Sequence, residues 1–381
     1  MIGMRYRALG LMSGTSMDGI DAALLETDGA RVFALGPART DPYDGLFRDR
    51  LRAALGPNSS PEDTDLARDL TERHAASVQR LLADAGLGPS NVDVVGFHGH
   101  TVHHDPKRGV TRQIGDGQLL ARRIGIPVVA DFRARDVAQG GEGAPLAPLY
   151  HAARALELEK PVAILNLGGV ANVTWIGVGA GAGAGISADC ALIAFDTGPG
   201  NALLDDWTRA VIGRPMDEDG RLARAGKPDR ALLDRWLADP YFRRLPPKSL
   251  DRDHFAGAWA AAQSLSPADG AATLARFTAE SVALARIHFR EPPRRWLIAG
   301  GGRHNGYLMN QLGHVLGANV APVEDAGWRG DFLEAEAFAF LAVRSLLGLP
   351  LSLPTTTGVR APCPGGTVHL PPGGIMPSAK R

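Results

Sequence analysis

The chain has 381 residues, 45% of them hydrophobic and 22% charged, as is typical of a soluble globular protein with a large core. Lysine plus arginine and aspartate plus glutamate both total 41, so the overall charge favours neither nucleic acid nor an anionic membrane as a partner. The two cysteines have no histidine at metal-ligand spacing, and no apolar run could span a bilayer or act as a secretion signal. We expect a cytoplasmic protein that acts on a small molecule.

The first half of the chain alternates strand and helix patterns. Strand-like runs at residues 6–12 and 20–25 flank a turn of small residues. Apolar residues recur at helical spacing over residues 64–85, and a buried-type strand follows at residues 92–97. This order predicts an α/β domain, in which ligands bind at the carboxyl ends of strands.

The second half repeats the opening of the first. Strand patterns at residues 162–165 and 173–176 flank a second glycine-containing turn, residues 166–172. The repeated layout indicates a duplication. We therefore predict an N-terminal domain of residues 1–138 and a C-terminal domain of residues 139–381, with the option that the last helix and the tail return to the first domain.

The first glycine turn is suited to phosphate. Backbone N–H groups that no bulky side chain covers form a concavity of positive potential. Asp18 and Asp21 would repel a bare phosphate but could hold Mg²⁺ directly or through water. A tight hairpin whose aspartates only serve turn geometry is an equal alternative. The candidate phosphate-binding residues are Gly14, Thr15, Ser16, Met17, Asp18, Gly19, Ile20 and Asp21.

A second candidate is Asp196. It ends an apolar run and precedes a stiff turn of small residues, after which apolar residues continue at helical spacing. A carboxylate fixed at such a point is a plausible general base, an effect worth about 10² to 10⁴ in rate. The alternative is that Asp196 only caps the following helix.

A late glycine run follows a buried strand. Gly300, Gly301 and Gly302 would let a flat ring or a phosphate approach the backbone, with Asn305 close by. The spacing to Gly306 does not match a dinucleotide-binding fingerprint. We interpret this run as a nucleotide-contacting loop.

Polar residues also follow two strands of the first half. His98, His100 and Thr101 are candidates for hydrogen bonds to a substrate, which we favour over metal ligation because the stretch is not helical. Asp131 and Arg133, with Asp136, would face the same cleft if the α/β interpretation holds. An exposed, salt-bridged loop is an equal alternative for these three residues.

Together these segments resemble the anhydro-N-acetylmuramic acid kinase family from about residue 9 to about residue 372. The first matching segment reads Gly-Leu-Met-Ser-Gly-Thr-Ser-Met-Asp-Gly-Ile-Asp at residues 10–21. The others, in chain order, are residues 99–104, 113–116, 131–133, 136–138, 143–146, 166–172, 195–201, 300–305, 334–335 and 337–339. Their number and order make a chance match implausible.

The resemblance implies a two-domain fold of the actin, hexokinase and Hsp70 type, which is a duplicated ribonuclease H-like fold with an ATP cleft between the domains. It implies that water opens the 1,6-anhydro ring of anhydro-N-acetylmuramic acid while O6 takes the γ-phosphate of ATP, in peptidoglycan recycling. By the same resemblance Asp196 is the base, residues 14–21 bind the phosphates and Mg²⁺, and a homodimer is expected. The implied nucleotide contacts also include Asn166, Gly168 and Gly169, and the implied sugar contacts include Glu334.

Two segments depart from the family pattern. Residues 96–101 read Gly-Phe-His-Gly-His-Thr where relatives usually carry Gly-Ser-His-Gly-Gln-Thr. Residues 248–253 read Lys-Ser-Leu-Asp-Arg-Asp in place of Lys-Ser-Thr-Gly-Arg-Glu. The sugar selectivity could therefore differ, and the alternatives are an ATPase or sugar kinase of the same fold with another substrate, or a sugar sensor without catalysis.

Overall fold

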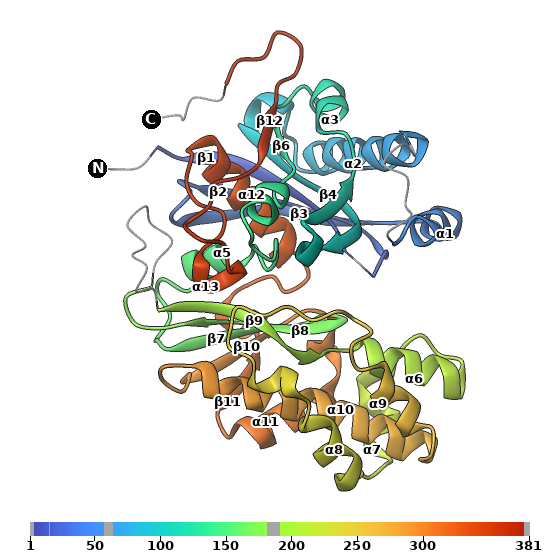
Figure 1. The fold of residues 1–381 in the computed structure, drawn as a ribbon. Helices are drawn as coiled ribbons and strands as arrows, with labels where there is room; N and C mark the ends of the chain where they lie inside the picture. The colour runs from blue at the N-terminus through green and yellow to red at the C-terminus, as the bar shows by residue number, and fades with distance from the viewer. Residues whose placement is uncertain (1–3, 15, 57–63, 181–190, 377–381) are drawn as a thin grey trace. The chain divides into compact units, whose positions relative to one another are not determined.

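The computed structural model describes residues 4–14, 16–56, 64–180 and 191–376 (Figure 1). The chain forms two compact units. The first contains the described residues of 1–156 and 332–381, and the second contains those of 157–180 and 190–331. No helix within the described residues is long and apolar enough to cross a membrane.

The first unit is built on a mixed seven-stranded sheet in the order β12-β6-β4-β1-β2-β3, with β5 paired to β4. Strands β1, β2 and β3 are antiparallel neighbours, whereas β4 and β6 run parallel to β1. The strands are β1 (Tyr6–Ser13), β2 (Gly19–Thr27), β3 (Val32–Pro42), β4 (Val94–Asp105), β5 (Val110–Ile114), β6 (Val128–Ala130) and β12 (Thr367–His369).

Helices cover both faces of this sheet. Helix α2 packs against α3 and the outer strands over a core that includes Leu9, Leu11 and Phe97, and α12 packs on β1, β2 and β4 (Figure 1). The helices of this unit are α1 (Gly45–Ala53), α2 (Thr64–Asp84), α3 (Gly117–Ile124), α4 (Ala134–Ala138), α5 (Pro148–Arg154), α12 (Leu333–Leu346) and α13 (Pro354–Thr357).

Two glycines on neighbouring strands let α12 lie close to the sheet. Gly10 in β1 pairs with Gly96 in β4. A Cβ atom at Gly10 would lie 1.8 Å from the carbonyl oxygen of Ala335, and one at Gly96 would lie 2.1 Å from that of Phe338. The helix backbone therefore occupies the space that side chains would fill at other positions.

The second unit has a five-stranded sheet in the order β11-β10-β7-β8-β9. Its strands are β7 (Val162–Leu167), β8 (Val170–Ile176), β9 (Leu192–Pro199), β10 (Arg295–Ala299) and β11 (Asn319–Pro322). Its helices are α6 (Ala202–Ile212), α7 (Arg221–Arg224), α8 (Arg230–Leu237), α9 (Ala256–Ala262), α10 (Pro267–Leu284) and α11 (Gly306–Leu316). The long helix α10 lies at the centre of its helical layer, against α6, α7, α8, α9 and α11.

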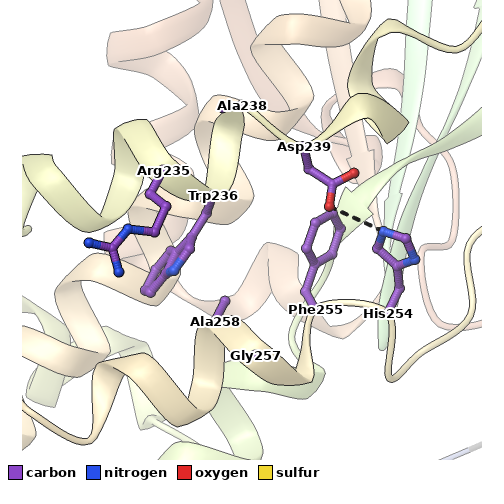
Figure 2. Close-up of a pocket in the computed structure, with 8 residues that line it drawn as sticks. All are labelled: Arg235, Trp236, Ala238, Asp239, His254, Phe255, Gly257 and Ala258. Carbon is purple, nitrogen blue, oxygen red and sulfur yellow. Dashed lines mark ion pairs between the residues drawn. The ribbon is translucent and has the colours of Figure 1, made fainter.

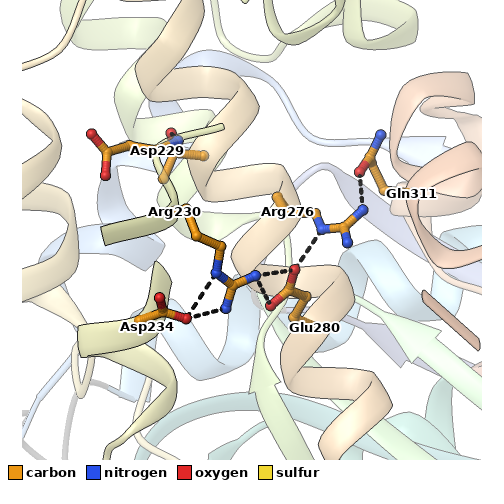
Figure 3. A network of polar contacts seen from close by, with 7 residues as sticks. Asp229, Arg230, Asp234, Arg276, Glu280 and Gln311 are labelled. Atoms are coloured by element: carbon orange, nitrogen blue, oxygen red, sulfur yellow. Dashed lines mark hydrogen bonds and ion pairs between the residues drawn. The ribbon is translucent and has the colours of Figure 1, made fainter. Parts of the chain in front are cut away.

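A polar network fixes three of these helices (Figure 3). Glu280 of α10 accepts from Arg230 of α8 at 2.9 Å and from Arg276 at 2.6 Å. Arg276 also donates to Gln311 of α11 at 2.8 Å. Because Glu280 is mostly buried, its carboxylate is held by two cations rather than by water.

The two sheets share one topology. In each unit the first three strands are antiparallel, and two later strands add in parallel beside the first, giving the orders β3-β2-β1-β4-β6 and β9-β8-β7-β10-β11. This repeated order is the duplicated α/β arrangement predicted from the sequence. The predicted fold class is confirmed.

The structure differs from the sequence prediction in three places. Strand β4 does not end at residue 97, because Gly99 adopts a φ of 71° and β5 pairs with the continuation to Asp105. The second glycine turn contains only Gly168 and Gly169, since β7 and β8 pair on both sides of them. Residues 139–156 lie with the first unit, where α5 packs against α12, and the position of α12 there is the option that the sequence prediction left open.

We expect Gly96→Ala to lower the free energy of unfolding by about 1 to 3 kcal/mol, because the new methyl group would force α12 away from the sheet. Urea unfolding measures this loss. Gly45→Ala is the matched control, since nothing lies within 4 Å of its Cβ position in α1 and alanine favours a helix. Equal midpoints for both variants would contradict this explanation of the glycine pair.

Candidate active site

The turn between β1 and β2 is held by its own buried side chains. Met17 has a φ of 56°, donates its N–H to Gly14 at 3.0 Å and buries its side chain in the core, as Ile20 does. Ser16 and Asp18 are exposed. Of the predicted phosphate-binding residues, Met17 and Ile20 can therefore offer only backbone groups, and Thr15 lies outside the described residues.

The two candidate Mg²⁺ ligands lie on either side of the start of β2. Asp18 is exposed, and Asp21 accepts a hydrogen bond from Thr40 of β3 at 2.6 Å. Within the described residues no group of three or more His, Cys, Asp or Glu side chains could hold a metal. The two carboxylates fit Mg²⁺ only as part of a shell completed by phosphate oxygens and water, which is the shell that Mg²⁺ prefers.

A buried hydrogen-bond chain ends just before this turn. The Tyr43 hydroxyl donates to Ser13 at 2.9 Å, and Ser13 lies 3.0 Å from Nδ1 of His100. Because Tyr43 donates, Ser13 can give its own proton to Nδ1, and the neutral ring then carries its proton on Nε2. That Nε2 atom is buried and has no hydrogen-bond partner among the described residues. Burial lowers the pKa of His100 and so favours the neutral ring.

His98 belongs to a different environment. Its ring lies 4.5 Å from that of Phe338 in α12, and Nε2 of His98 accepts from Nε of Arg133 at 3.0 Å. His100 instead pairs with Ser13 across the bulge at Gly99, so the two histidines point to opposite faces of the sheet. Thr101 points elsewhere again, since its hydroxyl accepts from Gln113 at 3.2 Å.

Arg133 is the centre of one candidate cluster. It donates to His98 and, at 2.7 Å, to the carbonyl oxygen of Gly143. Burial lowers the pKa of its guanidinium, while the negative charges of Glu334 and Asp136 raise it. Arg133, His98 and Glu334 are therefore brought together. Asp131 is exposed with a φ of 56° and is bonded to the backbone of Ala134, at the start of α4.

Asp136 does not face a ligand. It is 2% exposed, and its carboxylate accepts hydrogen bonds from the Gly143 N–H at 2.7 Å, from Thr357 at 2.6 Å and from the Ser352 hydroxyl. This residue ties the glycine-rich segment after α4 to the C-terminal segment. An exposed, salt-bridged loop, the alternative left open by the sequence, is wrong for Asp136.

In the second unit Asp196 lies inside β9. Its N–H donates to the carbonyl oxygen of Lys248 at 3.0 Å, its carbonyl oxygen accepts from the Tyr241 hydroxyl at 2.6 Å, and its Oδ2 accepts from the Leu250 N–H at 2.8 Å. Helix α6 begins at Ala202 with Asn201 as its cap position. The alternative that Asp196 caps this helix is therefore wrong.

Three glycine-containing turns meet at the carboxyl ends of β7 and β10. The Asn201 N–H donates to Gly168 at 2.8 Å, and the Gly200 N–H donates to Gly169 at 3.0 Å. A Cβ atom at Gly300 would lie 2.4 Å from Oδ1 of Asn166. These turns pack closely at the carboxyl ends of strands, and α/β folds bind ligands at such strand ends.

Of Gly300, Gly301 and Gly302, Gly301 is the one that is exposed and has open space at its Cβ position. Asn305 accepts from the Leu308 N–H at 3.0 Å and so caps α11. Arg303, which sequence reasoning did not select, donates to Gly300, Glu324 and Asp331 from a nearly buried position. Its three bonds fix the loop.

The sequence matches the family described as anhydro-N-acetylmuramic acid kinase over residues 6–371. It is 57% identical over 363 residues to the anhydro-N-acetylmuramic acid kinase of Rhodospirillum rubrum, covering 94% of this chain and 93% of that protein. It is 56% identical to that of Paramagnetospirillum magneticum, covering 96% and 99%. The solved component A of (R)-2-hydroxyglutaryl-CoA dehydratase from Acidaminococcus fermentans aligns with a TM-score of 0.48 at 12% identity, over 89% of this chain and 98% of that one.

The chain belongs to the anhydro-N-acetylmuramic acid kinase family. The resemblance seen in the sequence is confirmed. The matched region of the kinase family contains every candidate residue from Gly14 to Glu334.

A pocket of about 300 Å³ lies between α8 and α9 (Figure 2). Its lining residues come just before η4 (Pro240–Arg243) and from residue 254 onward. Asp239 and His254, which line it, form an ion pair at 3.5 Å. Asp239 also accepts from the Tyr241 N–H at 2.8 Å. The predicted site residues lie outside this pocket. The Asp239–His254 pair supports η4, whose Tyr241 contacts Asp196.

A carboxyl group that sequence reasoning missed is Asp205 of α6. Burial raises its pKa to about 7, and the neighbouring negative charge of Asp206 adds to this shift. The only sign of this group in the sequence is the pair of adjacent aspartates, because the burial that raises the pKa of Asp205 arises from the fold.

We expect Asp136→Ala to lower the free energy of unfolding by about 2 to 4 kcal/mol, because three buried donors lose their acceptor. Urea unfolding at neutral pH measures it. Asp49→Ala, which removes an exposed ion pair with Arg52, should change stability by less than about 0.5 kcal/mol. A mild effect at Asp136 would show that this carboxylate is not the acceptor described.

Stability should also fall as the pH drops below about 6.5. Burial lowers the pKa of His74 to about 4, so between these values the unfolded chain binds a proton that the folded protein does not. His74→Leu removes this group, and the loss of unfolding free energy between pH 7 and 5.5 should shrink by about 1 kcal/mol. An unchanged loss in urea titrations at the two pH values would contradict a neutral, buried His74.

Proposed function

We propose that this protein converts anhydro-N-acetylmuramic acid, water and ATP into N-acetylmuramic acid 6-phosphate and ADP. Water adds to the anomeric carbon and the bond from that carbon to O6 breaks. O6 then forms a bond to the γ-phosphorus of ATP, while the bond from that phosphorus to the β–γ bridging oxygen breaks and ADP leaves. The water proton passes to the Asp196 carboxylate and then to solvent. The observation that carries this proposal is the family match over residues 6–371.

Asp196 suits the role of general base. It is half-buried on a strand, and its backbone and one carboxylate oxygen are held by hydrogen bonds. A fixed carboxylate loses little freedom when it accepts a proton, so it can act at a defined distance from a bound water.

The phosphates would lie on the first turn of the chain, against residues 14–19, where Ser16 is exposed and the nearest atom to the Cβ position of Gly14 is Oγ of Ser16 at 3.7 Å. Asp18 and Asp21 would hold Mg²⁺, which when bound neutralises phosphate charge. Asn166, Gly168, Gly169 and residues 300–302 would contact the rest of the nucleotide, with Gly301 the most open of them. Asn305 would act indirectly, by capping α11 beside the loop.

The sugar would contact the cluster of Arg133, His98 and Glu334, which offers one cation, one imidazole and one carboxylate. The Arg133 guanidinium suits the carboxylate that N-acetylmuramic acid derivatives carry. We propose more indirect roles for His100, Thr101 and Asp131, because each is hydrogen-bonded within the protein. On the basis of the family resemblance, we also propose that the protein is cytoplasmic and forms a homodimer.

We expect Asp196→Asn to lower the rate of ADP release by about 10² to 10⁴, because an amide cannot take the water proton. ADP is measured with anhydro-N-acetylmuramic acid, with N-acetylmuramic acid and without sugar. Wild type should be active only with the anhydro sugar, and Asp234→Asn on the surface of α8 should match wild type. Equal turnover without sugar would refute the kinase assignment and favour an ATPase.

A further inference from the structure

Lys248 is a buried cation close to Asp196. It is 4% exposed and lies between η4 and α9. Its Nζ donates to the carbonyl oxygens of Tyr241 at 3.1 Å and Phe242 at 3.2 Å, and lies 3.3 Å from Nε2 of His288. The two carbonyl oxygens accept two of the three N–H groups of the ammonium, and Nε2 of His288, which also lies 3.4 Å from the carbonyl oxygen of Phe242, accepts the third in the tautomer that carries its proton on Nδ1.

Aromatic rings complete its surroundings. Nζ lies 4.7 Å from the ring centre of Tyr241 and 5.4 Å from that of Phe195. In the described part of the chain no carboxylate forms an ion pair with Lys248. The charge is therefore held by carbonyl dipoles, an imidazole lone pair and ring faces, an arrangement with strict geometry.

The main chain around Lys248 holds Asp196 on both sides. The carbonyl oxygen of Lys248 accepts from the Asp196 N–H, and two residues later the Leu250 N–H donates to Oδ2 of Asp196. Strand β9 is at the edge of its sheet, so residues 248–250 cover its free edge at this position. Tyr241, whose carbonyl oxygen binds the ammonium, donates its hydroxyl to the Asp196 carbonyl oxygen.

We propose that Lys248 is a positioning residue for the reaction: its ammonium group joins η4 to residues 248–250, and this joint fixes the orientation of the Asp196 carboxylate. The inference deepens the proposed function, since it rests on Asp196 being the base. An apolar side chain of the same length would fill the space but would leave two carbonyl oxygens and one imidazole nitrogen without a donor.

The proton on Lys248 matters for this role. Burial, with the positive charge of Arg244, lowers the pKa of Lys248 to about 8. The other titratable groups that face it are Tyr241 and His288, and burial, with the Lys248 charge, lowers the pKa of His288. Above pH 8 the neutral Lys248 amine has only two N–H donors for its three acceptors. The contact between η4 and residues 248–250 therefore weakens, and kcat falls.

The first test is Lys248→Met in the sugar-dependent ADP assay. We expect kcat to fall at least about ten-fold with KM for ATP unchanged, because a misplaced base slows the chemical step and not nucleotide binding. Lys227→Met, at an exposed lysine, should match wild type. Lys248→Met should cause no further loss in the Asp196→Asn background. A kcat within two-fold of wild type, or two losses that multiply, would overturn the proposal.

The second test is the pH profile, which needs no apolar variant. The kcat of wild type should decline above about pH 8, whereas Lys248→Arg, which stays charged, should lose this decline. The same decline in Lys248→Arg would overturn the role of the ammonium even if Lys248→Met fails to fold. A wild type without sugar-dependent ADP release would overturn the proposed function itself, and with it this inference.

Discussion

The position of a carboxylate on an edge strand depends on the segment of the chain that covers that edge. Asp196 lies on β9, the last strand of its sheet, and in the part of the chain that the structure describes no further strand supplies partners for its outer backbone groups. Lys248 and Tyr241 bond to its backbone N–H and carbonyl oxygen instead, and the Leu250 N–H donates a third hydrogen bond to its carboxylate. The proposed chemistry therefore depends on a loop packed around a buried ammonium as much as on the sheet.

The duplicated fold provides the same backbone frame twice and the two units use it differently. The β1–β2 turn is long, carries the candidate Mg²⁺ ligand Asp18 and is anchored by a buried Met17. The equivalent β7–β8 turn has only Gly168 and Gly169, and its carbonyl oxygens are bonded to the segment after β9. The first turn is thus the one we propose for the phosphates, whereas the second packs against the Gly300 loop, with which we propose that it contacts the rest of the nucleotide.

Local pattern was enough to predict the elements that carry the motifs. The first hairpin and helix α2 lie where periodicity and turn residues placed them. The direction of side chains was not predictable, because it depends on long-range pairing. His98 and His100 are two residues apart and would share a face in a regular strand, but the bulge at Gly99 against β1 sends them to opposite faces.

The residues that sequence reasoning missed or misjudged share one physical cause. Asp136, Arg303 and Lys248 are charged, and charged residues in loops are normally exposed. Each is buried here because segments further along the chain bring the partners: Thr357 for Asp136, Glu324 for Arg303 and His288 for Lys248. A buried charge is stable only when all its partners are in place, so such residues mark the loops whose shape the protein must hold. In this family member those loops are the ones that carry or support the candidate site.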